Sequence, residues 1–210
     1  MVDLKQFENG KFIIRFCSCE TLNNADIYVK AFNKGYAKKP KDYLESCRTV
    51  IVIANPVDFS EDKYCRNIFS LGYPGYGKVY NLSKIIERYL NENGYKAKVA
   101  HNISQKSAAV LSGIGVWGKN SLVLNEIYGT HLRLDSVVTD WIPEEYSIPL
   151  NIDLCGNCED CINACPYACL TPYKVNAKKC FNKYIKRSEL SIELPMCPVC
   201  QIACKYNKNI

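Results

Sequence analysis

Eight cysteines between residues 155 and 204 constrain this 210-residue chain more than any other feature of its sequence. The first four have the spacing C-x2-C-x2-C-x3-C and are followed by Pro166; they are Cys155, Cys158, Cys161 and Cys165. This spacing is typical of bacterial ferredoxins, in which the first three thiolates bind one [4Fe–4S] cube and the fourth binds a neighbouring cube. The run therefore predicts a second cluster, whose other ligands lie elsewhere in the chain.

The other four cysteines of this region complete both clusters. They are Cys180 and the C-x2-C-x3-C run of Cys197, Cys200 and Cys204. Since each cube takes four thiolates, we predict two crossed ligand sets: Cys155, Cys158, Cys161 and Cys204 for one [4Fe–4S] cluster, and Cys165, Cys180, Cys197 and Cys200 for the other. Zinc typically takes two C-x2-C pairs, and disulfides need an oxidising compartment to which no segment directs the chain.

The formal net charge of +6 comes entirely from residues 171–210, which hold eight Lys or Arg and two Asp or Glu. An oxidised cube with four thiolates carries about 2−, so two cubes cancel about four of these charges. We interpret the basic segment as a solvated face that balances the clusters, with an RNA-binding face as the alternative. Its basic residues include Lys174, Lys178, Lys179, Lys183, Lys186 and Arg187.

The beginning of the sequence has no apolar signal core, and no run of 18 apolar residues is present. We therefore expect a cytoplasmic protein without a membrane partner. Five cysteines lie outside the predicted ligand sets, and small buried apolar side chains are the simplest interpretation of them. They are Cys17, Cys19, Cys47, Cys65 and Cys169. Redox sensing through the C-x-C pair of Cys17 and Cys19 is a further interpretation.

The first 140 residues alternate irregularly between strand and helix patterns, which predicts a layered structure of both element types. The apolar, β-branched run Thr49–Ala54 predicts a strand buried on both faces. Other strands are predicted at Lys11–Phe16, Lys96–Ala100, Ser121–Leu124 and His131–Asp140, the last two paired with each other. Helical periodicity predicts helices at 79–92, ended by Asn93-Gly94, and at Gln105–Ser112. Residues 70–78 are expected to form a loop that either lines a ligand or only connects two elements.

The segment from Gly113 to Gly118 matches the dinucleotide-binding pattern G-x-G-x-x-G. A dinucleotide loop must follow a strand and open a helix, so that the helix N-terminus meets the pyrophosphate. This segment follows a predicted helix and leads into a predicted strand, so NAD binding is not predicted. Residues 141–150 contain two prolines and an acidic pair, which is typical of a linker. We predict an α/β cofactor or partner domain at 1–150 and a double-cluster module at 151–210.

Several segments resemble epoxyqueuosine reductase, a family related to the reductive dehalogenases. They are Gly115-Val-Trp-Gly-Lys-Asn-Ser-Leu-Val-Leu-Asn125, Val138-Thr-Asp140, the run from Cys155 to Pro166, Lys179-Cys180, and Cys197-Pro-Val-Cys200-Gln-Ile-Ala-Cys204. The resemblance covers residues 105–207 in the same order and spacing. It implies an α+β protein in which a nitroreductase-like, cobalamin-binding domain precedes a ferredoxin-like double [4Fe–4S] module.

The resemblance also implies an activity and its partners. Electrons from a low-potential donor would pass through the clusters to cobalamin, which removes the epoxide oxygen of epoxyqueuosine in tRNA; no DNA partner is expected. Positions near the cofactor in that family match Gly118, Lys119, Asn120 and Asp140. A tight turn at the first three and a strand-end cap at Asp140 are the alternative interpretations.

The sequence departs from the family at three places. The family has an acidic proton donor just after the strand that corresponds to Lys96–Ala100, and counting back from Gly113 places Val99 there, with His101 nearby. The sequence ends soon after the clusters, as a short form without the family's C-terminal helical-repeat region, and Lys205 replaces a proline. The alternative function is therefore a ferredoxin-like electron carrier whose N-terminal domain binds a partner without catalysis.

Overall fold

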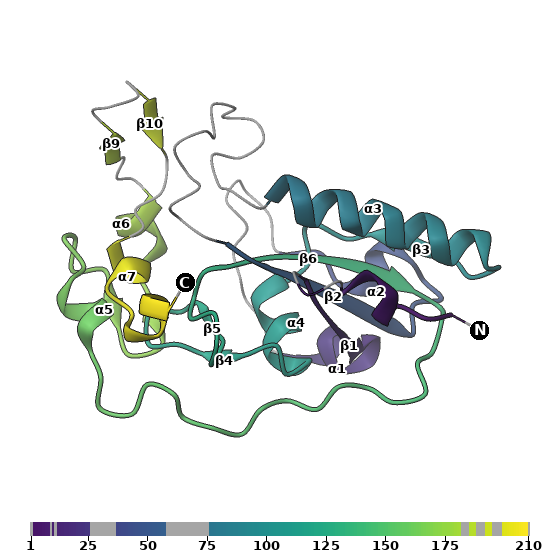
Figure 1. The fold of residues 1–210 in the computed structure, drawn as a ribbon, viewed down its shortest axis with the longest axis horizontal. Coiled ribbons are helices and arrows are strands. Elements are labelled where there is room, and N and C mark those ends of the chain that lie inside the picture. The colour runs from purple at the N-terminus through teal and green to yellow at the C-terminus, as the bar shows by residue number, and fades with distance from the viewer. Residues whose placement is uncertain are drawn as a thin grey trace. The chain divides into compact units, whose positions relative to one another are not determined.

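The computed structural model describes residues 2–8, 10, 12–25, 37–57, 76–181, 185–187, 192–194 and 199–209. They divide into two compact units (Figure 1). Unit 1 contains the described residues of Met1–Val57, Gly75–Gly115 and Leu132–Leu150, and unit 2 contains Val116–His131 and the described residues from Asn151 onward. The last segment of unit 1 ends at Leu150, and Val116–His131 belongs to unit 2.

Unit 1 is built on an antiparallel four-stranded sheet with the strand order β1-β2-β6-β3. The strands are β1 (Ile13–Ser18), β2 (Thr49–Pro56), β3 (Ala97–Val99) and β6 (Leu132–Thr139). Four of the predicted strands are thus present with small shifts of their ends. As expected, Val50 to Ala54 of β2 are completely buried.

The predicted pairing of the last two strands is wrong. β6 pairs with β2 and β3, whereas β5 (Val123–Leu124) pairs with β4 (Val116–Trp117) in unit 2. The physical reason is burial. Val137 and Val138 point to opposite faces of β6 and are both completely buried, which requires a strand in the interior of a sheet covered on both faces.

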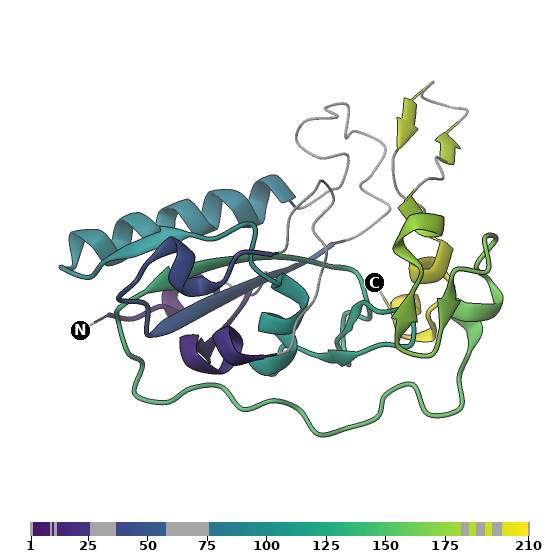
Figure 2. The same cartoon turned by 180° about the vertical axis from the view of Figure 1, so that it is seen from behind.

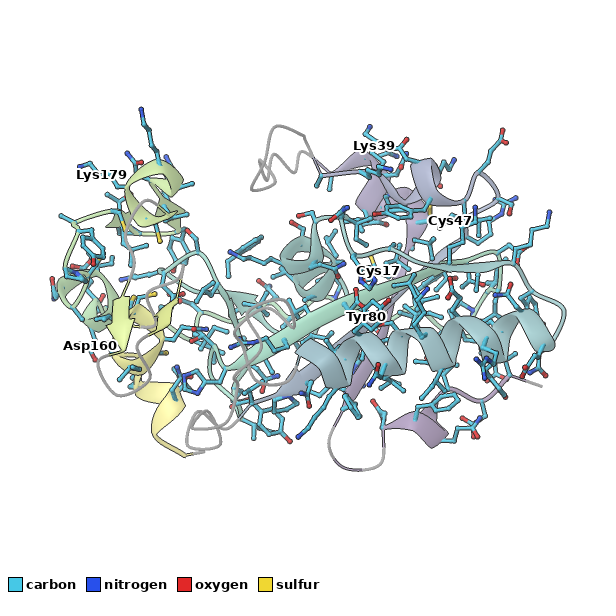
Figure 3. The ribbon with its side chains drawn as sticks, turned by 90° about the horizontal axis from the view of Figure 1, so that it is seen from above. Cys17, Lys39, Cys47, Tyr80, Asp160 and Lys179 are labelled. Carbon is cyan, nitrogen blue, oxygen red and sulfur yellow. The ribbon has the colours of Figure 1, made fainter. Side chains whose placement is uncertain are left out.

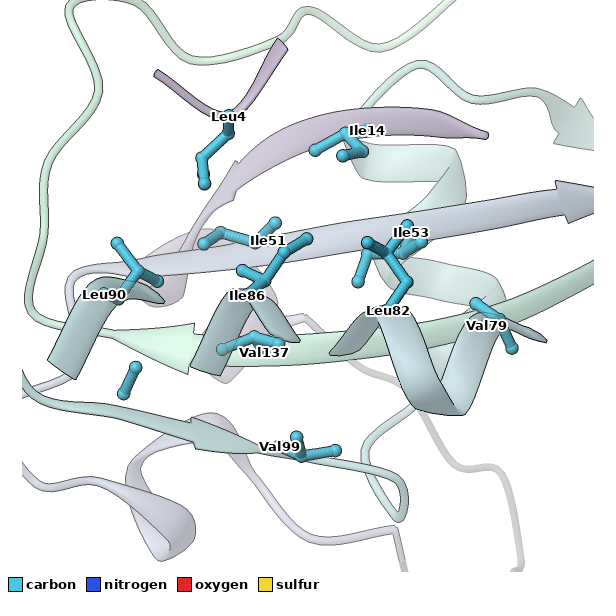
Figure 4. Close-up of a cluster of buried hydrophobic side chains, with 11 residues drawn as sticks. Leu4, Ile14, Ile51, Ile53, Val79, Leu82, Ile86, Leu90, Val99 and Val137 are labelled. Atoms are coloured by element: carbon cyan, nitrogen blue, oxygen red, sulfur yellow. The ribbon is translucent and has the colours of Figure 1, made fainter. Parts of the chain in front are cut away.

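Helices cover both faces of this sheet. α3 (Tyr76–Glu92) lies on one face, while α1 (Cys19–Asn24) and α4 (Gln105–Leu111) lie on the other, as Figures 1 and 2 show. The core beneath α3 consists of Val79, Leu82, Ile86 and Leu90 of the helix and Ile14, Ile51, Ile53, Val99 and Val137 of the strands (Figure 4). The predicted helix is confirmed and begins earlier, at Tyr76, so the expected loop at 70–78 is partly helical; its other residues lie outside the described ones.

Glycines end both long helices of unit 1 in the left-handed conformation. Gly94 has φ +86° after α3, and the Tyr95 amide donates to the Leu90 carbonyl. Gly113 has φ +71° after α4, and the Ile114 amide donates to the Ala109 carbonyl. Both are Schellman-type ends, for which glycine is favoured. The first glycine of the G-x-G-x-x-G match is therefore a helix stop.

The remaining elements of unit 1 are the 3-10 helix η1 (Lys5–Phe7) and α2 (Pro40–Tyr43). Residues 141–150 have no helix or strand, as expected of a linker, but Trp141 packs edge-on against Phe16 at 5.3 Å between ring centroids. Among the described helices, none combines the length and the apolar character needed to cross a membrane.

Unit 2 consists of short elements joined by turns. In addition to β4 and β5 they are α5 (Asp160–Asn163), β7 (Leu170–Thr171), β8 (Lys174–Val175), α6 (Ala177–Phe181), β9 (Ile185–Arg187), β10 (Ile192–Leu194), α7 (Val199–Ile202) and the 3-10 helix η4 (Lys205–Asn209). α5 packs against α7, which brings the two halves of the cysteine region together.

Candidate metal centre

Four thiols of unit 2 line one cavity. They are Cys155, Cys158, Cys161 and Cys204, the same four that the crossed assignment gives to one cluster. The first three come from the turn and helix at residues 155–163, and Cys204 is brought to them by α7. Among the described residues, no group of His, Cys, Asp or Glu side chains is close enough to hold a single metal ion. The thiols surround a space instead.

Local hydrogen bonds shape the turn that presents the first thiols. The Asp153 carboxylate accepts hydrogen bonds from the amides of Cys155 and Gly156, both at 3.0 Å. Gly156 has φ +49°, and the Cys158 amide then donates to the Cys155 carbonyl at 2.9 Å. This Asp turn bends the chain before α5, so that thiols three residues apart point into the same cavity.

The thiols of this cavity lie within one another's electrostatic field. Burial, together with the neighbouring Cys155, Cys204 and Cys158, raises the pKa of Cys161 to about 11. Burial is also the main cause that raises the pKa of Cys204, with Cys155 and Cys158 contributing. Several thiolates cannot be held here without a compensating cation, since buried charges of like sign are unfavourable. A polynuclear iron centre fits this donor set, because it replaces the thiol protons with positive charge.

The predicted cofactor residues Gly118, Lys119 and Asn120 line the same cavity. They form a tight turn in which the Gly118 amide donates to the Leu122 carbonyl at 2.8 Å and Ser121 has φ +59°. A side chain at position 118 would meet the Asn120 Oδ1 atom at 2.9 Å, so the close approach requires glycine. The Lys119 amide donates to Cys155 Sγ at 3.4 Å, and Asn120 Nδ2 donates to the Cys200 carbonyl at 3.4 Å.

The fourth predicted cofactor residue, Asp140, lies in unit 1 and does not line this cavity. Its carboxylate accepts a hydrogen bond from the Lys96 amide at 2.9 Å, and its amide donates to the Lys96 carbonyl. Asp140 therefore ends the β3–β6 ladder, which is the strand-end role that the sequence left open.

A second group of thiols lies farther along unit 2. Cys165 Sγ is 3.3 Å from Cys169 Sγ, and Cys169 interacts in turn with the thiol of Cys180. Burial raises the pKa of Cys165, but hydrogen bonds from the amides of Cys169 and Tyr167 and from the Cys169 thiol outweigh it, so that this pKa is lowered overall. Cys197 lies outside the described residues. Sequence reasoning did not assign Cys169 to this group, because its spacing from Cys165 fits no ligand run.

Three other cysteines are buried in unit 1, as the sequence predicted. Burial raises the pKa of Cys17 to about 12. Cys19 and Cys47 share a hydrogen bond between their thiols, which lowers the pKa of Cys19 and raises that of Cys47. Cys17 and Cys47 are labelled in Figure 3. Cys65 lies outside the described residues.

The two units have the fold shared by epoxyqueuosine reductases and reductive dehalogenases. A crystal structure of a selenomethionine-labelled epoxyqueuosine reductase matches 97% of this chain and 63% of its own, with a TM-score of 0.71 and 22% identity. A reductive dehalogenase whose structure suggests a mechanism for B12-dependent dehalogenation matches 93% of this chain and 30% of its own, with a TM-score of 0.68 and 15% identity.

Among curated proteins the chain is similar to epoxyqueuosine reductases in particular. The Lactococcus garvieae enzyme is 29% identical over 196 residues, which are 82% of this chain and 55% of that protein. The Listeria monocytogenes enzyme is 36% identical over 119 residues, which are 51% of this chain and 30% of that protein. The aligned part of this chain thus spans about half of the Lactococcus garvieae protein and less than a third of the Listeria monocytogenes protein. No family model matches it. The predicted resemblance is confirmed.

Proposed function

We propose that this chain is an iron–sulfur oxidoreductase that reduces an epoxide of the epoxyqueuosine type. Electrons from a low-potential donor would pass singly through two [4Fe–4S] clusters, with cobalamin as the further cofactor. The observation that carries the proposal is that Cys204 joins three thiols of the C-x2-C-x2-C run around one cavity. The similarity to epoxyqueuosine reductases supports the reaction class.

The chain's own residues would hold and tune the clusters. Cys155, Cys158, Cys161 and Cys204 would bind one cluster, and Cys165, Cys180, Cys197 and Cys200 the other; bound clusters supply one-electron transfer. The Lys119 amide would donate to a ligating thiolate through Cys155 Sγ. Such hydrogen bonds to cluster sulfurs stabilise added negative charge and raise the reduction potential.

Cobalamin and tRNA enter the proposal through the relatives. If the resemblance extends to the cofactor, Gly118, Lys119, Asn120 and Asp140 would lie near the cobalamin. One solved epoxyqueuosine reductase is in complex with an epoxyqueuosine-modified tRNA stem loop. In this chain Lys174, Lys178 and Lys179 are exposed on unit 2, which supports an RNA-binding face as well as charge balance of the clusters.

Anaerobic reconstitution with iron, sulfide and hydroxocobalamin, followed by desalting, tests the proposal. We expect about eight irons and one corrinoid per chain, and conversion of an epoxyqueuosine-modified tRNA stem loop to the queuosine form with dithionite as reductant. Four irons, or stoichiometric zinc, would contradict the two-cluster proposal. Eight irons without corrinoid and without turnover would instead identify the electron carrier.

A further inference from the structure

A buried carboxylate in unit 1 has no role in the cluster chemistry. Asp135 of β6 is only 4% exposed and lies on the same strand face as Val137, beneath α3. Ser83 Oγ of α3 donates to Asp135 Oδ2 at 2.6 Å, and His101 Nδ1 lies 2.7 Å from Asp135 Oδ1. A buried carboxylate is costly unless it is paired and hydrogen-bonded. Its neighbours Ile51, Ile53 and Val137 on this face are apolar, whereas Arg133, two residues away on β6, is a second buried charged residue of the same face. The buried carboxylate therefore marks a candidate functional position.

His101 is held in one orientation by two contacts. Its Nδ1 atom meets Asp135, and its ring stacks on Tyr80 with centroids 4.9 Å apart and an interplanar angle of 21°. Tyr80, labelled in Figure 3, belongs to the first turns of α3. When the Nδ1–H group donates to the Asp135 carboxylate, Nε2 is the ring nitrogen that can give or accept a proton. The His101 side chain is 42% exposed, so the ring reaches solvent although its Asp135 partner is buried.

Val99, the position that the resemblance aligns with the missing acidic donor, cannot take that role. Its side chain lies in the core beneath α3 and is 9% exposed (Figure 4). An acid there would have to be buried among apolar side chains. His101 follows two residues later, beyond the end of β3, and its side chain is partly exposed.

We propose that His101 is the catalytic proton donor of this chain and that Asp135 is its positioning residue; this inference rests on the proposed function. Removal of an epoxide oxygen takes two electrons and two protons and yields an alkene and water. The electrons come from the low-potential donor. The protonated imidazole gives its Nε2 proton to the epoxide oxygen as the carbon–oxygen bond breaks. Its Nδ1 proton stays on the ring and remains hydrogen-bonded to Asp135. Water supplies the second proton and restores the imidazolium.

The experiment compares reconstituted full-length variants under saturating dithionite, with the epoxyqueuosine-modified stem loop as substrate. His101→Ala should lower kcat by about 10²–10⁴-fold, the usual contribution of a placed general acid, with little change in KM. Added imidazole should restore part of the rate. Asp135→Asn should lower kcat about tenfold or more with the KM retained, because the tautomer and orientation are lost. Lys98→Ala removes an exposed basic side chain of the same edge strand and should leave the rate within about twofold.

Two further measurements distinguish a catalytic role of His101 from a structural one. Reduction of the clusters by dithionite should be equal in all variants, since electron delivery does not involve His101. The chain has only two histidines, so ¹⁵N-imidazole spectra can be assigned with one variant, and Asp135→Asn should change the His101 tautomer signal.

The outcomes are distinct. If the unmodified holoprotein turns over and His101→Ala stays within about threefold of it, the donor assignment is overturned while the proposed function stands. A slow His101→Ala that imidazole does not restore, combined with a normal Asp135→Asn, also overturns the assignment, because it indicates a structural role. An unmodified protein with full iron and corrinoid that never reduces the epoxide overturns the proposed function and the donor role together.

Discussion

Asn207 of η4 links the segment after Cys204 to the turn at residues 125–131, and its truncation tests what holds Cys204 at the cavity of unit 2. The Thr130 amide donates to Asn207 Oδ1 at 2.7 Å, and Asn207 Nδ2 donates to Thr130 Oγ1 at 3.0 Å and to the Gln201 carbonyl. The residue is 9% exposed and lies three positions after Cys204. Asn207→Ala should therefore loosen the segment that presents Cys204 to the cavity.

The magnitude follows from the groups left without partners. In Asn207→Ala the Thr130 amide and the Gln201 carbonyl both lose a hydrogen bond, and each unsatisfied buried group costs about 1–3 kcal/mol. We expect a loss of about 2–6 kcal/mol in total. For a guanidinium chloride dependence of about 4 kcal/mol per molar, the midpoint of unfolding should fall by about 0.5–1.5 M.

The assay is anaerobic denaturation in guanidinium chloride, followed by cluster absorbance and iron release. Asn163→Ala is the matched control, because Asn163 is an exposed asparagine of α5 in the same unit; its midpoint should change by less than about 0.2 M. Asn207→Asp keeps the acceptor for the Thr130 amide and should fall between the wild type and Asn207→Ala. A midpoint of Asn207→Ala equal to that of Asn163→Ala, with full iron, would refute the reasoning.

Three further predictions concern both units. Cys165→Ala should reduce the iron content from about eight to about four per chain, while Cys169→Ala should leave it unchanged; the reverse result would make Cys169 the ligand. Gly113→Ala should cost about 2–4 kcal/mol in thermal unfolding, since φ is +71° and the added Cβ would meet the Ile148 carbonyl at 2.3 Å. Gly94→Ala, with φ +86° and open space, should cost only about 1–2 kcal/mol, and equal costs would contradict the clash. Burial raises the pKa of Cys17 from 9.0 to about 12, so its contribution to stability is present below pH 9 and is lost as the pH rises toward 12. Between pH 8 and 10.5 the wild type should lose about 2 kcal/mol more in urea than Cys17→Ala, and parallel losses would exclude this effect.

Local sequence signals determined most individual elements. The 3.6-residue period of Leu82, Ile86 and Leu90 predicted α3, and the β-branched run of β2 predicted a strand buried on both faces. These signals are local because each depends on side chains within one or two turns or strand repeats. The cysteine spacing predicted which four thiols belong together, and the structure places Cys155, Cys158, Cys161 and Cys204 around one cavity.

Only the tertiary structure decided the pairing of β6 and the partners of the polar side chains. A strand pattern indicates that β6 is buried but not which strands flank it, and the strand that precedes β6 in the sequence pairs with β4 instead. Asp135 lies 52 residues from Ser83 and 34 residues from His101, the two side chains that it contacts. No sequence periodicity joins residues so far apart, because their contacts arise when strands pair and helices pack on the sheet. Cysteine spacing thus predicted four thiols that share one cavity, whereas the pairing of β3 with β6 brought His101 and Asp135 together.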